Sequence, residues 1–183
     1  MKLKKQLRTL DEETQGIENL LQCIRVEPET GKCFWLEKRS NKIPAGSEAG
    51  SFHKSSGYTR IKFENAMYIR SRVIFYYVNG YLPVMVDHVH GVECGDMISN
   101  LRESNQVTNQ QNRTRNKNNT VGFKGVSFNK KSQKYSAKIT LHGVTKWLGF
   151  YDSAEEASEA YKAKALVSFT HNERYLNDLT DSE

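Results

Sequence analysis

A short stretch of the sequence holds an acid–imidazole pair and two asparagines whose chemistry suits phosphodiester hydrolysis. Asp87 and His88 are adjacent, Asn100 lies twelve residues after His88, and Asn109 lies nine residues after Asn100. An imidazole, with an ordinary pKa of ~6.5, suits general-base activation of water. Carboxylate and amide oxygens suit a hard cation such as Mg²⁺, which polarises a phosphate. Each residue alone is more often structural or incidental, so the prediction depends on the whole set, its order and its spacing.

The segments around these residues predict a hairpin followed by a helix. Val84–Val89 alternates like a strand, and Ile98–Arg102 leads into a second extended segment. Gln106–Asn116 is polar throughout, and we expect a helix there, entered through Asn105 as its cap. A helix with so few apolar residues is expected to contact a ligand or the preceding hairpin.

The residues before the hairpin predict a mixed α and β module. We expect a helix over residues 1–26 with Asp11 as its cap, and a buried helix over Ser71–Val78 that Gly80 ends. Residues 39–57 are rich in Ser, Gly, Asn and Lys and predict a loop. The strands expected here are Lys32–Lys38, Tyr58–Phe63 and Ala66–Ile69.

The last third of the chain predicts three strands and a helix. The strands are Gly125–Asn129, Lys134–Leu141 and Val144–Phe150, and a capping box at Ser153 opens the helix. Alternation predicts that Leu148 and Phe150 face the helix. It also predicts an outer sheet face with lysines and one tryptophan, which suits a DNA major groove. The outer residues expected are Lys134, Lys138 and Trp147.

Charge is concentrated in the middle of the 183-residue chain. Residues 102–146 hold ten basic residues and one acid, whereas residues 147–183 carry a net charge of −5. This pattern is typical of a polyanion-binding surface, although a solvated surface explains the charge alone equally well. No apolar run is long enough to span a membrane. The charged N-terminus and three scattered cysteines predict a chain without a secretion signal, in a reducing cytoplasm.

The stretch Gly80–Asn112 resembles the HNH homing endonucleases of phages and mobile introns. Their pattern of Asp-His, glycine, Asn-Leu-Arg and a final pair of asparagines occurs here without a gap. The last third resembles the ethylene-response-factor-like (Apetala-two type) DNA-binding domain, which is often appended to phage HNH enzymes. The matching residues are Asp87, His88, Gly91, Asn100–Arg102, Asn109 and Asn112 in the first stretch, and Gly125-Val126, Trp147–Phe150, 154–157 and Tyr161 in the second.

The resemblance implies a role for each matching residue. His88 would be the catalytic general base, with Asn100 locking the hairpin and helping to orient it. Asp87 and Asn109 would hold Mg²⁺ or Mn²⁺. The expected partner is double-stranded DNA, bound by a monomer or weak dimer. One active site per chain favours nicking of a single strand. The expected location is the cytoplasm of a bacterial or phage-infected cell. The expected DNA contacts are Arg102, Asn112, Arg113, Arg115, Lys117, Lys124, Lys130, Lys134, Lys138, Lys146 and Trp147.

These expectations give an α+β fold with two modules. A ββα-metal (HNH) nuclease domain spans residues 1–112, with its core at about 81–116. A basic linker (113–120) leads to a three-stranded antiparallel sheet packed on one helix (121–172), and an acidic tail (173–183) follows.

Three residues depart from the HNH pattern, and two other functions stay open. Ser71 stands where many relatives have His, and His90 and Asp96 stand where relatives often have Asn. We treat His90 as a surface histidine. The main alternative is a non-catalytic, sequence-specific DNA-binding protein, whose hairpin only positions the chain. A less favoured alternative is an RNA-binding accessory protein.

Overall fold

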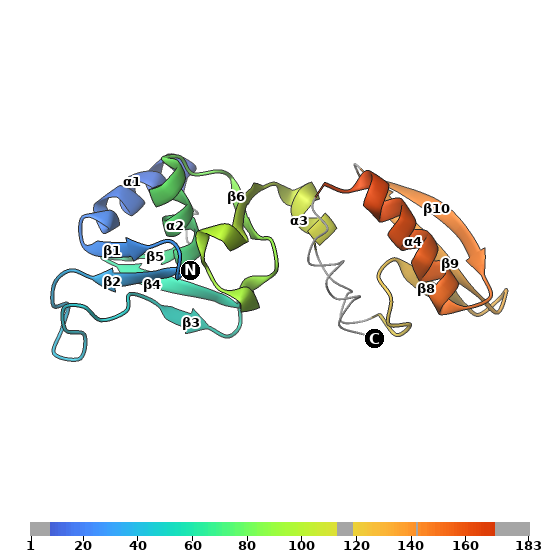
Figure 1. The fold of residues 1–183 in the computed structure, drawn as a ribbon, viewed down its shortest axis with the longest axis horizontal. Coiled ribbons are helices and arrows are strands. Elements are labelled where there is room, and N and C mark those ends of the chain that lie inside the picture. The colour runs from blue at the N-terminus through green and yellow to red at the C-terminus, as the bar shows by residue number, and fades with distance from the viewer. Residues whose placement is uncertain (1–7, 113–118, 142, 171–183) are drawn as a thin grey trace, which may run out of the picture. The chain divides into compact units, whose positions relative to one another are not determined.

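The structure, a computed structural model, describes residues 8–112, 119–141 and 143–170 (Figure 1). It divides the chain into two compact units, one ending at Ser104 and the other starting at Asn105. The mixed α+β class is confirmed, with small antiparallel sheets and four α-helices in the described part. The first unit therefore ends eight residues before the expected boundary at 112. Most of the expected linker, and all of the expected acidic tail, lie outside the described residues.

The first helix, α1 (Leu10–Leu21), begins and ends differently from the prediction. Thr9, not Asp11, is its cap: Thr9 Oγ1 accepts a hydrogen bond from the Glu12 amide, and the Glu12 carboxylate accepts one from the Thr9 amide. This reciprocal capping box satisfies two amides at once, which a lone Asp11 would not do. The helix ends at Leu21 because the next residues form a strand.

That strand, β1 (Ile24–Glu27), pairs antiparallel with β2 (Lys32–Trp35). Ile24 and Val26 are buried and alternate with more exposed residues, and β-branched side chains favour such a half-buried strand. The prediction that the first helix continues to residue 26 is therefore wrong, because these residues pair with β2. Gly31, in the turn between the strands, has a φ of +68°.

A second sheet of β3 (Ser51–His53), β4 (Tyr58–Phe63) and β5 (Ala66–Ile69) pairs in that order. The predictions for β4 and β5 are confirmed. The prediction of an unbroken loop over 39–57 is wrong, because it contains β3. All residues of β3 are exposed, so no buried face marks this edge strand in the sequence.

Helix α2 (Arg70–Asn79) is buried through its first half and ends at Gly80, as predicted. Its apolar residues pack with α1 and the sheets into one core, which includes Ile17, Leu20, Trp35, Ile61, Val73 and Ile74. Arg72 binds the Glu13 carboxylate of α1 through Nε and Nη2. Its Nη1 donates to the carbonyls of Pro83 and Val84, each at 3.2 Å. Arg72 thus fixes the segment that leads into the next strand.

This next strand, β6 (Met85–His88), pairs antiparallel with β7 (Leu101–Ser104). The register places Asp87 opposite Arg102 and His88 opposite Leu101. Two short 3₁₀ turns, η1 (Val92–Cys94) and η2 (Ile98–Asn100), connect the strands. The predicted hairpin is therefore present in the first unit.

The second unit begins with α3 (Gln106–Asn112), which Asn105 caps as predicted. The sheet of β8 (Val126–Asn129), β9 (Lys134–Leu141) and β10 (Val144–Tyr151) has the order β10-β9-β8. Figure 1 shows α4 (Ala154–Ser168) lying across this sheet. Small residues on α4 allow the close packing: Ala157 and Ala165 are fully buried there. Among the described residues, no helix has the length and apolar character that crossing a bilayer requires.

A β-bulge in β10 changes which side chains share a face. The register shifts between Trp147 and Gly149, so Trp147 lies opposite Lys138 and Phe150 lies opposite Ser136. Leu148 packs into the apolar core under α4, whereas Phe150 and Trp147 are exposed. The prediction that Phe150 faces the helix with Leu148 is therefore wrong, because one extra residue at a bulge reverses the alternation.

Candidate functional site

His88 lies at the end of β6 and is nearly enclosed, with 3% of its surface exposed. Its Nε2 is 2.8 Å from Oδ1 of Asp96, in the loop between η1 and η2. Its ring centroid is 6.0 Å from that of Tyr58 on β4, and the rings are tilted by 38°. The imidazole is thus held in place by groups from the hairpin and from the second sheet.

Asn100 fastens the loop that follows His88. Its Oδ1 accepts a hydrogen bond from the His90 amide at 2.8 Å. Its Nδ2 donates to the carbonyls of Gly91 and Gly95, at 3.0 and 2.8 Å. The side chain is buried, so these bonds hold the two sides of the loop together where water does not compete.

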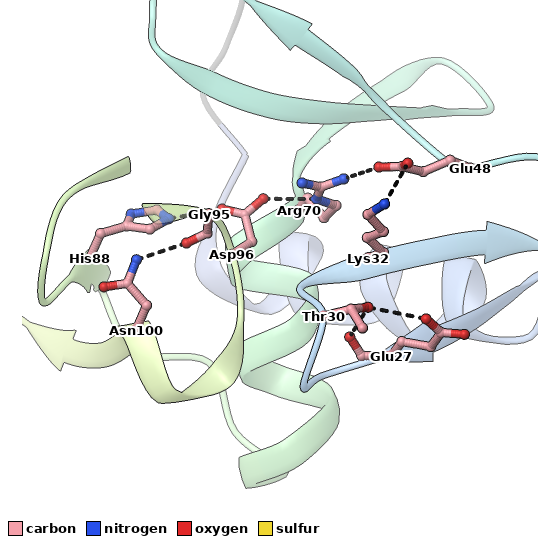
Figure 2. Close-up of polar contacts among 9 residues, drawn as sticks. All are labelled: Glu27, Thr30, Lys32, Glu48, Arg70, His88, Gly95, Asp96 and Asn100. Carbon is pink, nitrogen blue, oxygen red and sulfur yellow. Dashed lines mark hydrogen bonds and ion pairs between the residues drawn. The ribbon is translucent and has the colours of Figure 1, made fainter. Parts of the chain in front are cut away.

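Asp96 belongs to a row of polar contacts that Figure 2 shows. Its Oδ2 accepts a hydrogen bond from Arg70 Nε at 2.8 Å. Arg70 Nη1 donates to Oε1 of Glu48 at 2.6 Å, and Lys32 Nζ lies 3.8 Å from Oε2 of the same carboxylate. This row, which we call the Asp96 network, consists of His88, Asp96, Arg70, Glu48 and Lys32.

Two opposing influences act on the acidity of Asp96. Burial raises its pKa, while the hydrogen bonds from His88 and Arg70 and the positive charge of Arg70 lower it. The result is a pKa below the ordinary value of 3.8. Asp96 is therefore an ionised carboxylate at neutral pH, which accepts hydrogen bonds and donates none.

The carboxylate oxygens of Asp87 are the hairpin's candidate ligands for a hard cation. Its Oδ2 lies 3.3 Å from Nη2 of Arg102, its cross-strand neighbour. One carboxylate suits Mg²⁺, which keeps several of its waters, so the donor chemistry fits. The Arg102 charge opposes a cation there unless the guanidinium takes another anionic partner. Among the described residues, no group of three His, Cys, Asp or Glu side chains converges as a metal site.

The structure brings four of the expected site residues together in one hairpin: Asp87, His88, Asn100 and Arg102. Asn109 lies on α3, in the second unit, and its side chain is outside what the structure describes. A role for Asn109 beside Asp87 therefore stays a prediction. His90 is exposed, in line with its treatment as a surface residue, while Ser71 is buried at the start of α2.

The outer face of the sheet in the second unit presents basic and aromatic side chains. Trp147 and Phe150 contact each other edge-to-face, with ring centroids 4.5 Å apart. Lys138 Nζ lies 5.8 Å from the centroid of the Trp147 ring. Lys134 pairs with exposed Asp152 at 2.9 Å. We call the set Lys134, Ser136, Lys138, Trp147 and Phe150 the outer sheet face.

The other expected DNA contacts are less uniform. Lys146 lies opposite Ile139 in the register, which directs it to the helix-covered side rather than the outer sheet face. Lys124 donates to the Gln111 carbonyl at 2.7 Å and lies over the Phe169 ring. Lys130 borders a shallow cavity of about 390 Å³, beside Asn119 and Phe128. Arg113, Arg115 and Lys117, and the side chain of Asn112, lie outside the described residues.

Sequence reasoning missed the direct partner of His88. Asp96 was treated as a departure from the family pattern, yet it is the residue that binds Nε2. The sequence did indicate Asp96 as a candidate partner, because its carboxylate follows His88 by eight residues in a loop with Gly91 and Gly95. Arg70 gave no such signal, because 26 residues separate it from Asp96.

Comparison with known proteins gives no further assignment. No protein-family description, no curated protein and no solved structure matches the chain.

Proposed function

We propose that this chain is a metal-dependent, HNH-type DNA endonuclease that nicks one strand of a duplex. Its nuclease chemistry belongs to the β6–β7 hairpin of the first unit, and its second unit binds the duplex. The observation that carries the proposal is the β6–β7 hairpin, in which Asp87 and His88 are adjacent and Asn100 fastens the loop between the strands.

His88 is the proposed general base. The oxygen of a water molecule forms a bond to phosphorus, and its proton passes to the imidazole. The phosphorus–oxygen ester bond on the opposite side breaks, and the leaving oxygen takes a proton from solvent. Asn100 keeps the loop, and with it the imidazole, in place.

Asp87 is the proposed ligand of one divalent cation, which would supply charge for the phosphate and for the leaving oxygen when bound. A second ligand at Asn109 stays a prediction from the resemblance. Arg102 has two states in this proposal. It pairs with Asp87 when DNA is absent, and it contacts a phosphate of the substrate when DNA is bound.

The second unit supports the DNA-binding half of the proposal. Lysines on the outer sheet face act as point charges, which suits phosphate contacts more than bidentate reading of guanine. Each phosphate neutralised makes binding more sensitive to salt, with a slope of roughly −0.9 per contact in a plot of log affinity against log salt. We expect a steep slope, and a nearly salt-independent affinity would contradict this half of the proposal.

The decisive experiment incubates the purified chain with supercoiled plasmid carrying its own flanking genomic DNA, with Mg²⁺ or with EDTA. Metal-dependent conversion to open circles is the expected result, and a linear product would instead mean double-strand cleavage. His88→Ala removes the base, and His88→Gln keeps an amide donor toward Asp96. Both should lose cleavage and retain binding, while His53→Ala, at an exposed histidine on β3, serves as the control.

One observation favours the non-catalytic alternative, a sequence-specific DNA-binding protein. A general base must reach water, and His88 is 3% exposed. This alternative predicts a clear gel shift on duplex DNA, intact plasmid under all metal conditions, and no change in either result with His88→Gln. Intact plasmid under these conditions would replace the nuclease proposal with this one.

A further inference from the structure

The carboxylate of Asp96 is oriented from both sides. Oδ1 faces His88 Nε2 and Oδ2 faces Arg70 Nε, each at 2.8 Å (Figure 2). Asp96 is 7% exposed, so water competes weakly for either oxygen. Because Arg70 always donates, its bond fixes which oxygen remains for His88.

Arg70 is itself held. Its side chain is 12% exposed and donates to Glu48, whose other oxygen lies near Lys32. The backbone of Asp96 is equally confined: a Cβ added to Gly31 would lie 2.5 Å from the Asp96 carbonyl carbon. The carboxylate therefore has little freedom to rotate away from the imidazole.

We propose that Asp96 is a positioning residue, which fixes the imidazole of His88 with its proton on Nε2 and so makes Nδ1 the basic nitrogen. An ionised carboxylate accepts hydrogen bonds and donates none, so the nitrogen that faces it must carry the proton. The lowered pKa of Asp96 is consistent with this ionised state at neutral pH. A second group that selects the tautomer of a catalytic or ligating histidine is a general device.

The catalytic meaning of this assignment rests on the proposed nuclease function. In that reaction the water proton forms a bond to Nδ1 and leaves a positively charged imidazolium, while the water oxygen bonds to phosphorus. Asp96 stays ionised throughout and stabilises the imidazolium with its negative charge. Its part in the reaction is to hold and orient His88, without contact to the substrate.

Asp96→Asn tests the assignment because Arg70 forces the orientation of the new amide. The Asn oxygen must accept from Arg70, so the amide NH₂ faces Nε2 of His88 and moves the imidazole proton to Nδ1. We expect cleavage at saturating DNA to fall at least about 100-fold, with KM unchanged; the corresponding change in serine proteases lowers kcat about 10⁴-fold. The matched control is Asp11→Asn, the same chemical change at an exposed position on α1.

Two-bond ¹H–¹⁵N NMR correlations of the imidazole report the tautomer without any cleavage assay. We expect Nε2–H in the wild-type chain and in Asp11→Asn, and Nδ1–H in Asp96→Asn. Adding Arg70→Met to Asp96→Asn frees the amide oxygen to turn toward His88. This double variant should restore Nε2–H and recover part of the cleavage rate, which a merely structural role for Asp96 would not produce.

Each outcome decides a separate question. A wild-type His88 protonated on Nδ1, or an unchanged tautomer in Asp96→Asn, overturns the tautomer assignment. An unchanged kcat in Asp96→Asn, with the tautomer changed, overturns the role of Asp96 in positioning His88 for cleavage. If Asp96→Asn fails to fold, the wild-type tautomer decides alone. If the tautomers follow the expectation and the wild-type chain cuts no DNA, the proposed nuclease function fails while the Asp96–His88 assignment stands.

Discussion

The hairpin of the first unit and the sheet of the second unit hold their polar side chains in opposite ways. In the hairpin, His88, Asp96 and Asn100 are all buried and bonded to named partners. On the outer sheet face, Lys138 and Trp147 are exposed, and the order of the face comes from apolar packing on the other side of the sheet.

The buried side chains of the hairpin have fixed positions, whereas the exposed side chains of the outer sheet face can move to meet a partner. Buried, fully bonded groups have strict positions, and a small displacement leaves them unsatisfied at a cost of about 1–3 kcal/mol each. Exposed lysines keep water and many rotamers, so they adapt to a partner and tolerate substitution. Backbone changes should therefore damage the hairpin's chemistry, whereas side-chain changes on the sheet should alter binding without altering stability.

The largest loss of stability expected is from Gly31→Ala. A Cβ there would lie 2.4 Å from the Met97 amide nitrogen and 2.5 Å from the Asp96 carbonyl carbon, at a φ of +68°. We expect the first unit to lose about 2–4 kcal/mol and cleavage to fall more than tenfold, because backbone rather than a flexible side chain must move. Denaturant unfolding followed by Trp35 fluorescence, in a Trp147→Phe background, measures the loss.

Gly46→Ala is the matched control for Gly31→Ala. Gly46 has a φ of +79°, but nothing lies within 4 Å of an added Cβ. Backbone strain alone should cost about 1–2 kcal/mol and leave cleavage unchanged. Equal losses from the two variants would contradict the importance of the contact with Asp96 and Met97.

Gly125→Ala is the corresponding change in the second unit. An added Cβ would lie 2.3 Å from the Tyr161 ring and 2.7 Å from the Lys138 carbonyl oxygen. We expect a loss of about 2–3 kcal/mol, measured by amide exchange in β9, with weaker DNA binding but unchanged cleavage at saturating DNA. Gly143→Ala, with a φ of +78° and open space, is the control. A lower cleavage rate at saturating DNA would mean that the units are not separate in function.

A third pair tests the bulge. Leu148→Ala should cost the second unit about 1–2 kcal/mol because Leu148 packs into the core under α4. Phe150→Ala should cost about 0.5 kcal/mol or less and weaken DNA binding, since its ring is exposed. Thermal unfolding and salt-controlled binding curves measure both. The reverse order of stabilities would contradict the assigned register.

The smallest effect expected is a difference in acid stability. The folded pKa of Asp96 lies below its ordinary 3.8, so its ionised form stabilises the first unit at higher pH. That stabilisation is lost as the pH falls from about 3.8 through the lowered value. Asp96→Asn should lack this part of the acid loss, while Asp152→Asn, at an exposed pair with Lys134, should unfold with the wild-type pH profile. If the stabilities of wild type and Asp96→Asn fall in parallel as the pH is lowered, ionised Asp96 does not contribute this stabilisation.

The elements that the sequence predicted well are those whose residues repeat a clear period between strong turn signals. β4 and β9 alternate, and Gly80 ends α2, so local chemistry decided these segments. The misses have longer-range causes. β3 is a strand only because it pairs with β4. Ile24 belongs to a strand that pairs with β2 and not to the first helix. The bulge in β10 changes the sheet face on which Phe150 lies.

The same division applies to the candidate site. Asp87, His88 and Asn100 were predictable because they lie within one short stretch and their residue types point to one chemistry. The contacts of Asp96 with Arg70 and with the Gly31 turn were not, since they join segments distant in the sequence. Such contacts follow from packing, and a pattern of neighbours along the chain carries no information about them.

The contact between the β1–β2 turn and the η2 region joins segments that are synthesised at different times. The Ile98 amide donates to the Pro28 carbonyl at 2.8 Å, and Gly31 leaves room for Asp96 and Met97. On a ribosome, the turn emerges some seventy residues before the loop that packs on it, and domains form as their segments become available. His88 and Asp96 therefore pair only after most of the first unit has been synthesised, and the turn that packs on Asp96 is made well before them.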